Sequence, residues 1–309
     1  MSKRLFRKLD IRAGIESSYG SDAAPVVAAV GVQLKNVTFT PLEGEEVSRD
    51  IILPYLGNQG VDLAGIYAKI EGEIEVAGSG AAGTAPAWGT VARMCSWAET
   101  ITAGVDTVYS LISDGFESGF FYWNHDGVKH ALLGVRGEFG GDWTVKKHPV
   151  FKVSLLGLLG TITDAALLAP SVSAYKRPVL VSKAATTLSI HAVSSPAESF
   201  MFNLGSKVDP RFLIGDESIE ITDRSTTGTA VVEAASLATV DWFAKAKART
   251  RGALQLVHGT AAGNIVQIDA PAVAIGKPTQ GQSQGILTYS LPLAFCPDSG
   301  DDELTITVK

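Results

Sequence analysis

The amino-acid sequence predicts a mainly β protein of antiparallel strands, with one short helix in each of two similar halves. Three observations support this fold class: polar and apolar residues alternate with a period of two, glycine-containing turns lie between the alternating segments, and only two segments have helical spacing. Hydrophobic residues make up 46% of the 309 residues. This fraction is sufficient for a packed core and excludes wholesale disorder.

The clearest alternating segment covers residues 69–76, where Ile70, Ile74 and Val76 alternate with charged or small residues. This pattern indicates a strand with one solvated and one buried face, which is typical of antiparallel sheets. Turn signals such as Asp126-Gly127 lie between segments of this kind. The sequence predicts further strands at residues 33–40, 120–124, 131–139, 150–156, 186–191, 218–221, 264–268, 285–293 and 304–308.

Two segments have the spacing of a helix. Residues 87–98 follow Pro86, a residue favoured at a helix start, and carry an i, i+3, i+4, i+7 set of apolar side chains at Val91, Met94, Cys95 and Ala98. In residues 237–251, Thr239 is placed to cap a helix, and basic residues precede Gly252, as expected at a helix C-terminus. The sequence therefore predicts one short helix in each half.

The two halves share a predicted order of elements. Each half has early strands, then a helix, and then further strands that end in a segment of similar character, at residues 150–156 and 285–293. We expect an internal duplication with a boundary at residues 175–183. The first domain then covers residues 1–175, and a second, diverged domain covers residues 180–309.

The charge balance and the cysteine count exclude several classes of protein. The chain has 26 Lys and Arg against 32 Asp and Glu, a net charge of −6, whereas a nucleic-acid binder needs a basic surface. Two cysteines, Cys95 and Cys296, are too few for a disulfide scaffold or a Cys-rich zinc module. No secretory signal or membrane-spanning segment is visible, so we expect a chain that folds in a cytoplasm without contacting a membrane.

A glycine-rich segment matches the dinucleotide fingerprint GxGxxG at Gly78, Gly80 and Gly83. A dinucleotide-binding strand is buried on both faces, but the strand before this segment carries glutamates along one face. We therefore interpret the segment as a flexible loop and keep a dinucleotide-binding enzyme as a remote alternative. His125 and His130 flank a predicted hairpin turn and are interpreted as exposed turn residues rather than metal ligands. We predict no catalytic, cofactor-binding or metal-binding residue.

Residues 41–60 form an unusually long connection between two predicted strands. Connections longer than about 12–15 residues are usually functional or disordered, and disordered linkers lack apolar clusters. This connection has an acidic, Arg-bearing beginning followed by clustered apolar residues, which is more typical of a protein interface. Its candidate contact residues are Glu43, Glu45, Glu46, Arg49, Asp50, Ile51, Ile52, Leu53, Tyr55 and Leu56.

Several strings of residues are family-specific rather than catalytic. They include Thr40-Pro41-Leu42-Glu43-Gly44, Val47-Ser48-Arg49-Asp50, Pro54-Tyr55-Leu56-Gly57, Ser113-Asp114-Gly115-Phe116-Glu117 and Leu133-Gly134-Val135-Arg136-Gly137. In these strings the chain resembles the major tail tube protein of long, non-contractile-tailed bacteriophages, the siphophage tail tube family. The resemblance is dense over residues 10–175 and thinner beyond.

The resemblance implies a tail-tube type β-sandwich or barrel whose strands join neighbouring copies into a ring. Stacked rings would form a hollow tail tube through which DNA is ejected into the host cell. The chain would then be a structural virion protein and not an enzyme, without a cofactor, assembled in the host bacterial cytoplasm. The resemblance also assigns the contact between stacked rings to the connection at residues 41–60.

The implied partners are further copies of the chain, a tape measure protein in the lumen, tail terminator and distal tail proteins, and double-stranded DNA that passes without specific binding. Tail tube folds usually form six-membered rings with one fold copy per chain. Two copies per chain predict a trimeric ring with pseudo-sixfold symmetry, and a hexamer is the alternative if the second half is an external decoration. Another tail component of the same fold, such as a distal tail or baseplate-hub ring, is an alternative that would end the stack.

Overall fold

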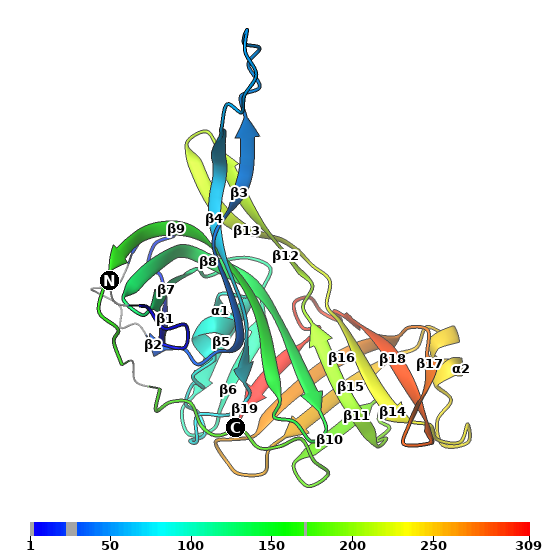
Figure 1. Ribbon diagram of the computed structural model, residues 1–309. Helices are drawn as coiled ribbons and strands as arrows, with labels where there is room; N and C mark the ends of the chain where they lie inside the picture. Colours follow the sequence, from blue (N-terminus) through cyan, green and yellow to red (C-terminus); the bar gives the residue numbers. More distant parts are fainter. Residues whose placement is uncertain (1–2, 23–29, 170–171) are drawn as a thin grey trace.

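The computed structural model describes residues 3–22, 30–169 and 172–309 and is mainly β, as the sequence predicts (Figure 1). Two short helices, α1 (Gly89–Arg93) and α2 (Trp242–Lys247), accompany the strands. The strands of the first half are β1 (Leu9–Ile15), β2 (Val30–Gly31), β3 (Lys35–Ser48), β4 (Val61–Glu75), β5 (Trp97–Thr102), β6 (Asp106–Leu111), β7 (Gly119–His125), β8 (Val128–Thr144) and β9 (Val150–Asp164). Those of the second half are β10 (Thr186–Ile190), β11 (Ala197–Asn203), β12 (Ser206–Leu213), β13 (Asp216–Arg224), β14 (Thr227–Glu233), β15 (Arg251–His258), β16 (Val266–Ile275), β17 (Thr279–Ser283), β18 (Ile286–Cys296) and β19 (Thr305–Val308).

One antiparallel sheet of eight strands crosses both halves, in the order β3-β4-β9-β8-β11-β14-β18-β17. The pairing of β8 with β11 joins the halves, because Gly140–Thr144 lie opposite Ser199–Asn203. Among the described residues, β3 pairs only with β4 and β17 only with β18, so these two strands are the edges of the sheet. We call this element the eight-stranded sheet.

A second antiparallel sheet has the order β10-β15-β16-β19-β6-β5 and also contains strands of both halves. Strand β7 pairs with the first part of β8, and β1 pairs with β7 and β2. The core packs aromatic rings from several elements: the Trp88 ring, just before α1, lies 4.7 Å from Tyr109 of β6 and 4.8 Å from Phe151 of β9. All three side chains are buried, and truncation of such a Phe or Trp to Ala typically costs about 3–5 kcal/mol.

The two halves have the same order of paired strands. In the first half the order is β3-β4-β9-β8-β7-β1, and each neighbouring pair is antiparallel. In the second half the order is β11-β14-β18, then β17 and β16, which both pair with β18, and then β15 and β10. The consecutive strands β17 and β16 together occupy the position that the single long strand β8 has in the first half. Helix α1 lies between β4 and β5, and helix α2 lies between β14 and β15. The β12–β13 hairpin lies between β11 and β14, the position that the outer parts of β3 and β4 have in the first half, whereas the β5–β6 hairpin has no counterpart among the described residues of the second half.

The predicted strands all fall within or overlap observed ones, but both predicted helices are shorter than expected. The first was expected over residues 87–98; α1 ends at Arg93, and Trp97 already belongs to β5. The apolar residues Met94 and Cys95 follow α1 in a turn and are fully buried there. Helical spacing in the sequence cannot distinguish such buried turn residues from the buried face of a helix. The second helix begins after Asp241, whose carboxylate accepts a hydrogen bond from the Ala244 amide at 2.8 Å, so the expected cap at Thr239 is wrong.

Candidate assembly surfaces

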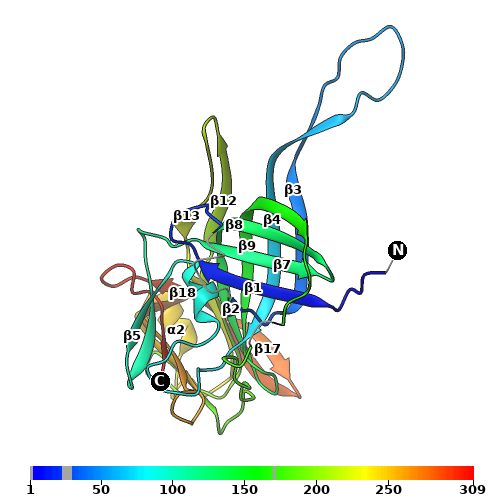
Figure 2. The ribbon, with the colours of Figure 1, turned by 90° about the vertical axis from the view of Figure 1, so that its left-hand side faces the viewer.

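Strands β3 and β4 extend beyond the body of the molecule as a projecting arm, shown in two orientations in Figure 1 and Figure 2. Much of the expected connection is therefore strand: β3 continues to Ser48, which lies opposite Val61 at the start of β4. Of the expected connection at residues 41–60, only residues 49–60 lack strand structure, and we call these residues the arm tip. The side chain of Gln59 accepts from the Ile51 amide at 3.0 Å and donates to the Ile51 carbonyl, which closes the base of the tip.

The arm tip exposes a cluster of apolar side chains. Ile52 and Leu56 are 98% and 103% exposed, and Tyr55 is 68% exposed. Ile51 and Leu53 are exposed as well, and so are the charged residues Glu45, Glu46, Arg49 and Asp50, whereas Glu43 is half-buried. A large apolar cluster without cover on a soluble chain is typical of a protein-binding surface.

A second hairpin, β12–β13, projects beside the arm at the same end of the molecule (Figure 2). Its tip residue Ile214 is 109% exposed, and Gly215 provides the left-handed turn at φ 93°. The Phe212 ring packs so closely against the arm that a Cβ on Gly65 would lie 3.0 Å from it. The sequence predicted only residues 218–221 of this hairpin as strand, although Gly215 between two alternating segments was a usable turn signal.

Arg136 on β8 fixes the β12–β13 hairpin to the body. Its guanidinium donates to the Ile219 carbonyl at 2.9 Å and to the Glu220 carboxylate at 2.6 Å, and it lies 5.0 Å from the centre of the Tyr19 ring. The Tyr19 hydroxyl accepts from the Ile219 amide at 2.5 Å. Burial raises the pKa of Tyr19 above its ordinary value, which keeps this hydroxyl neutral. These contacts give the hairpin a defined direction.

One face of the eight-stranded sheet is open to solvent. A row of register partners crosses seven strands on this face: Lys35, Glu73, Lys152, Gly140, Asn203, Thr227 and Ala294. The neighbouring positions on β4, β8 and β14 add the carboxylates of Glu71, Glu75, Glu138, Asp142 and Glu233. A hollow on this face is lined by residues of both halves, among them Glu71, Glu138, Lys152 and Thr229.

The cations on the open face are paired with carboxylates. Lys69 lies 2.8 Å from Glu71, Lys152 lies 3.0 Å from Asp142, and Lys35 lies 3.5 Å from Glu75. Glu138 and Glu233 form no ion pair within the part of the chain that the structure describes. The face therefore has acidic residues in excess, and its cations are already engaged.

A family model described as a phage tail tube protein matches residues 7–295, nearly the whole chain. The chain belongs to the phage tail tube protein family. This membership confirms the resemblance to a phage tail tube protein and places the protein in the virion tail. A search of curated protein sequences found no significant match. None of the described helices is long and apolar enough to span a membrane.

In this tail tube protein the GxGxxG segment is a packing element. The Gly78 amide donates to the Asn264 side-chain oxygen at 2.6 Å, and the Gly80 amide donates to the Gly263 carbonyl at 2.9 Å. The expected flexible loop is therefore a packed contact with the second half. The strand before it is antiparallel to both its neighbours and carries glutamates on its open face, which is not the setting of a dinucleotide site.

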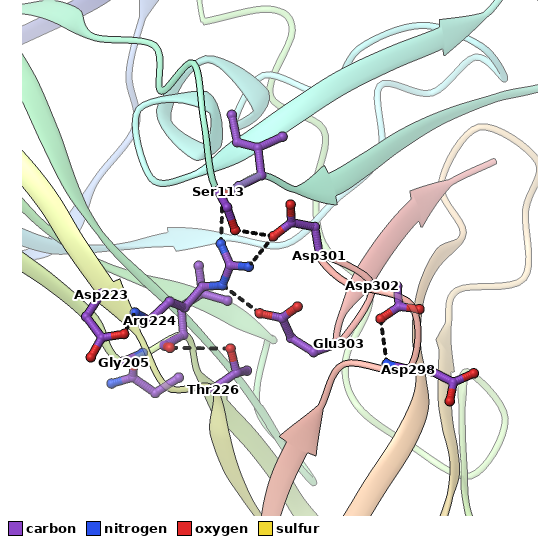
Figure 3. Close-up of polar contacts among 12 residues, drawn as sticks. Ser113, Gly205, Asp223, Arg224, Thr226, Asp298, Asp301, Asp302 and Glu303 are labelled. Carbon is purple, nitrogen blue, oxygen red and sulfur yellow. Dashed lines mark hydrogen bonds and ion pairs between the residues drawn. The ribbon is translucent and has the colours of Figure 1, made fainter.

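The tail tube protein also has a charged cluster between its halves, shown in Figure 3. The Arg224 guanidinium, at the end of β13, donates to the Glu303 carboxylate at 2.6 Å, to Asp301 at 2.9 Å and to the Ile112 carbonyl at 2.7 Å. Hydrogen bonds from Ser113 and Arg224 lower the pKa of Asp301. Because Arg224 and Glu303 are largely buried, the cluster fixes the C-terminal segment against the first half.

The histidine and cysteine residues considered in the sequence analysis lie in packed or hydrogen-bonded positions. His125 and His130 flank the β7–β8 turn as predicted, but both are half-buried rather than exposed, and the His125 ring nitrogen lies 2.8 Å from the Phe6 carbonyl oxygen. Cys95 is buried, and burial raises the pKa of its thiol. Residues 3–22, 30–169 and 172–309 contain no group of three or more His, Cys, Asp or Glu side chains that could hold a metal ion.

Proposed function

We propose that this protein forms rings that stack into the hollow tube of a long, non-contractile phage tail, and that the tube conducts DNA into the host. The observation that carries the proposal is the eight-stranded sheet with one open, acidic face and two unpaired edges. The role is structural, and the mechanism requires neither catalysis nor a cofactor.

The open face suits the wall of a DNA conduit. Carboxylates such as Glu73 and Glu138 repel phosphates, and the lysines that could hold DNA are paired with carboxylates on the same face. A duplex would therefore slide along the wall, because binding requires free cations that replace the counterions of the phosphates. The other face of the sheet is packed into the core and provides rigidity.

The arm and the β12–β13 hairpin suit contacts between rings. Both project at the same end of the molecule, and both end in exposed apolar side chains. Insertion of Ile52, Tyr55 and Leu56 into a surface of the next ring would bury the apolar cluster of the arm tip. At about 25 cal/mol per Å² of buried apolar area, such contacts repeated around a ring add to a substantial stacking energy.

We propose that the halves are duplicated domains, residues 1–175 and 180–309, and that three chains close a ring with pseudo-sixfold symmetry. The shared strand order of the halves supports the duplication. The hexamer and the stack-ending ring are the competing assemblies. Tape measure, tail terminator and distal tail proteins would be the remaining partners, and assembly would take place in the host cytoplasm.

Electron microscopy of the purified protein tests the proposal. Long tubes whose cross-section has threefold symmetry, built from rings of about 97 kDa (three chains of 32.4 kDa), are the expected result. True sixfold symmetry would overturn the trimer. Single capped rings that never elongate would instead indicate a stack-ending component.

A further inference from the structure

We infer that β17 of one chain pairs antiparallel with β3 of the next chain, in the register that β8 and β11 use within a chain. Thr279 then lies opposite Thr40 of the neighbouring copy, and Gly281 opposite its Thr38. The inference rests on the proposed ring, but it specifies a junction that ring formation alone does not fix.

The two edges of the eight-stranded sheet are counterparts of the two strands at its central junction. Strand β8 lies beside β9 as β17 lies beside β18, and strand β11 lies beside β14 as β3 lies beside β4. In the chain, β8 pairs on its other side with β11. The corresponding sides of β17 and β3 have no partner within the described residues.

The register follows from aligning the pairs that the halves share. Strand β4 lies against β9 with Glu75 opposite Val150 and Lys69 opposite Leu156. Strand β14 lies against β18 with Glu233 opposite Thr288 and Thr227 opposite Ala294. Strand β4 ends at Glu75 and β14 ends at Glu233, and aligning these two ends makes Glu75 correspond to Glu233 and Val150 to Thr288. Both intervals are six residues on each strand, so the alignment continues without a gap.

The alignment extends directly to the edges. Thr40 lies opposite Lys69 as Asn203 lies opposite Thr227, so Thr40 corresponds to Asn203. By the same step Thr279, opposite Ser290, corresponds to Gly140, opposite Lys152.

Within the chain, Gly140 pairs with Asn203. The corresponding pair between chains is therefore Thr279 with Thr40.

The edge strands themselves fit this pairing. Strand β17 is exposed over Thr279–Gln282 and contains neither Lys nor Pro, the residues with which proteins usually block an unpaired edge. Both β3 and β11 have a bulge at the same end, between Lys35 and Thr38 and between Ala197 and Ser199. The inner side of β3 is already ordered, because the Phe39 ring stacks on Trp123 at 4.6 Å.

Each chain thus offers two different edges, and a heterologous junction of this kind closes into a ring when the rotation permits. The same geometry would continue the open, acidic face from one chain to the next. A slip of one residue would turn the side chains of β17 to the opposite face, so the inferred register is sharply testable.

Cysteine cross-linking tests the register in assembled rings, in a Cys296→Ser background that removes the partly exposed native thiol. The Thr40→Cys/Thr279→Cys protein should form reducible covalent oligomers up to a closed ring, because paired strands bring Cα atoms within the range of a disulfide. A mixture of the two single variants should yield covalent dimers and nothing larger. The Thr144→Cys/Ser199→Cys protein has its cysteines at the corresponding junction within the chain. It should form an intramolecular disulfide and remain a single chain on a denaturing, non-reducing gel.

The register control is Thr40→Cys with Gln282→Cys, three positions away on the opposite face of β17, which should give little cross-linking. Tubes that form normally while the register control cross-links better than Thr279→Cys would overturn the inference and leave the proposed function intact. Absence of rings and tubes in the parent protein would overturn the proposed function itself.

Discussion

Gly78 and Gly263 lie so close that a Cβ atom on Gly78 would be 2.1 Å from the Gly263 carbonyl oxygen. The contact joins the segment after β4 to the loop before β16, and therefore joins the two halves of the chain. Both partners are backbone atoms, so no side chain can move aside to relieve the clash.

We expect Gly78→Ala to lower the free energy of unfolding by about 1–3 kcal/mol, the usual effect of overpacking. Gly72→Ala is the matched control, because a Cβ there meets its neighbours at 3.5 Å or more, an ordinary contact. Urea unfolding of both variants measures the difference. Equal midpoints for Gly78→Ala and the parent protein would show that the two loops are not held together.

Replacement of Arg224 by Met should destabilise the protein by about 3–5 kcal/mol, because Glu303 would remain buried without its partner. Lys207→Met is the control: its ion pair with Asp209 is exposed, and exposed pairs contribute only about 0–1 kcal/mol. The free energies are obtained from urea unfolding monitored by tryptophan fluorescence. A loss for Arg224→Met no larger than that for Lys207→Met would contradict a structural role for the cluster.

Removal of the arm tip should abolish tubes while leaving folded protomers or rings. Since Ser48 lies opposite Val61, an Asn-Gly turn can replace residues 49–60 without changing the register of β3 and β4. Electron microscopy should show single rings for this variant. Tubes of normal length would rule out the arm tip as the stacking element.

Substitution of Ile214 by Asp should weaken tube formation without affecting the fold, because the side chain at the β12–β13 tip is fully exposed in the protomer. Leu237→Asp, which also replaces an exposed aliphatic side chain by an acid but lies outside both projecting hairpins, is the control. The measurement is the protein concentration at which tubes appear by light scattering. If the two variants assemble at the same concentration as the parent protein, the second hairpin does not contact the next ring.

Stability should fall as the pH is lowered through about 6.5. Burial lowers the pKa of His191 and of His258 from 6.5, so the unfolded chain binds more protons than the folded chain in this range. The free energy of unfolding then rises with pH, because it increases wherever the unfolded state holds more protons. Urea midpoints at pH values of about 5.5 and 7.5 measure the effect, and His258→Gln should reduce the difference. A higher midpoint at the lower pH would contradict the prediction.

The sequence predicts the strands of this fold well where one face is buried and the other is wet. Ile70 and Ile74 of β4 are fully buried between half-exposed charged residues, and alternation reveals such strands. The sequence predicts a loop for the outer arm, beyond Thr40, because neither face of the strand is buried there and no period of two can arise. The sequence predicts a helix through Met94 and Cys95, although α1 ends at Arg93, because residues buried on every side carry no periodic signal that would separate helix from turn. The pairing of β8 with β11 joins segments distant in sequence, so no local pattern encodes it.

The junction between β8 and β11 also has a kinetic consequence. Because both strands belong to one chain, their encounter is intramolecular, and its effective concentration is set by the intervening residues rather than by the amount of protein in the cell. In the proposed ring, half of the lateral junctions would therefore form during folding, and only the others would require diffusional collisions. Three separate chains must associate to close this ring, whereas six would be needed if each chain carried one copy of the fold. Ring assembly would therefore start at lower protein concentration and depend less steeply on expression level.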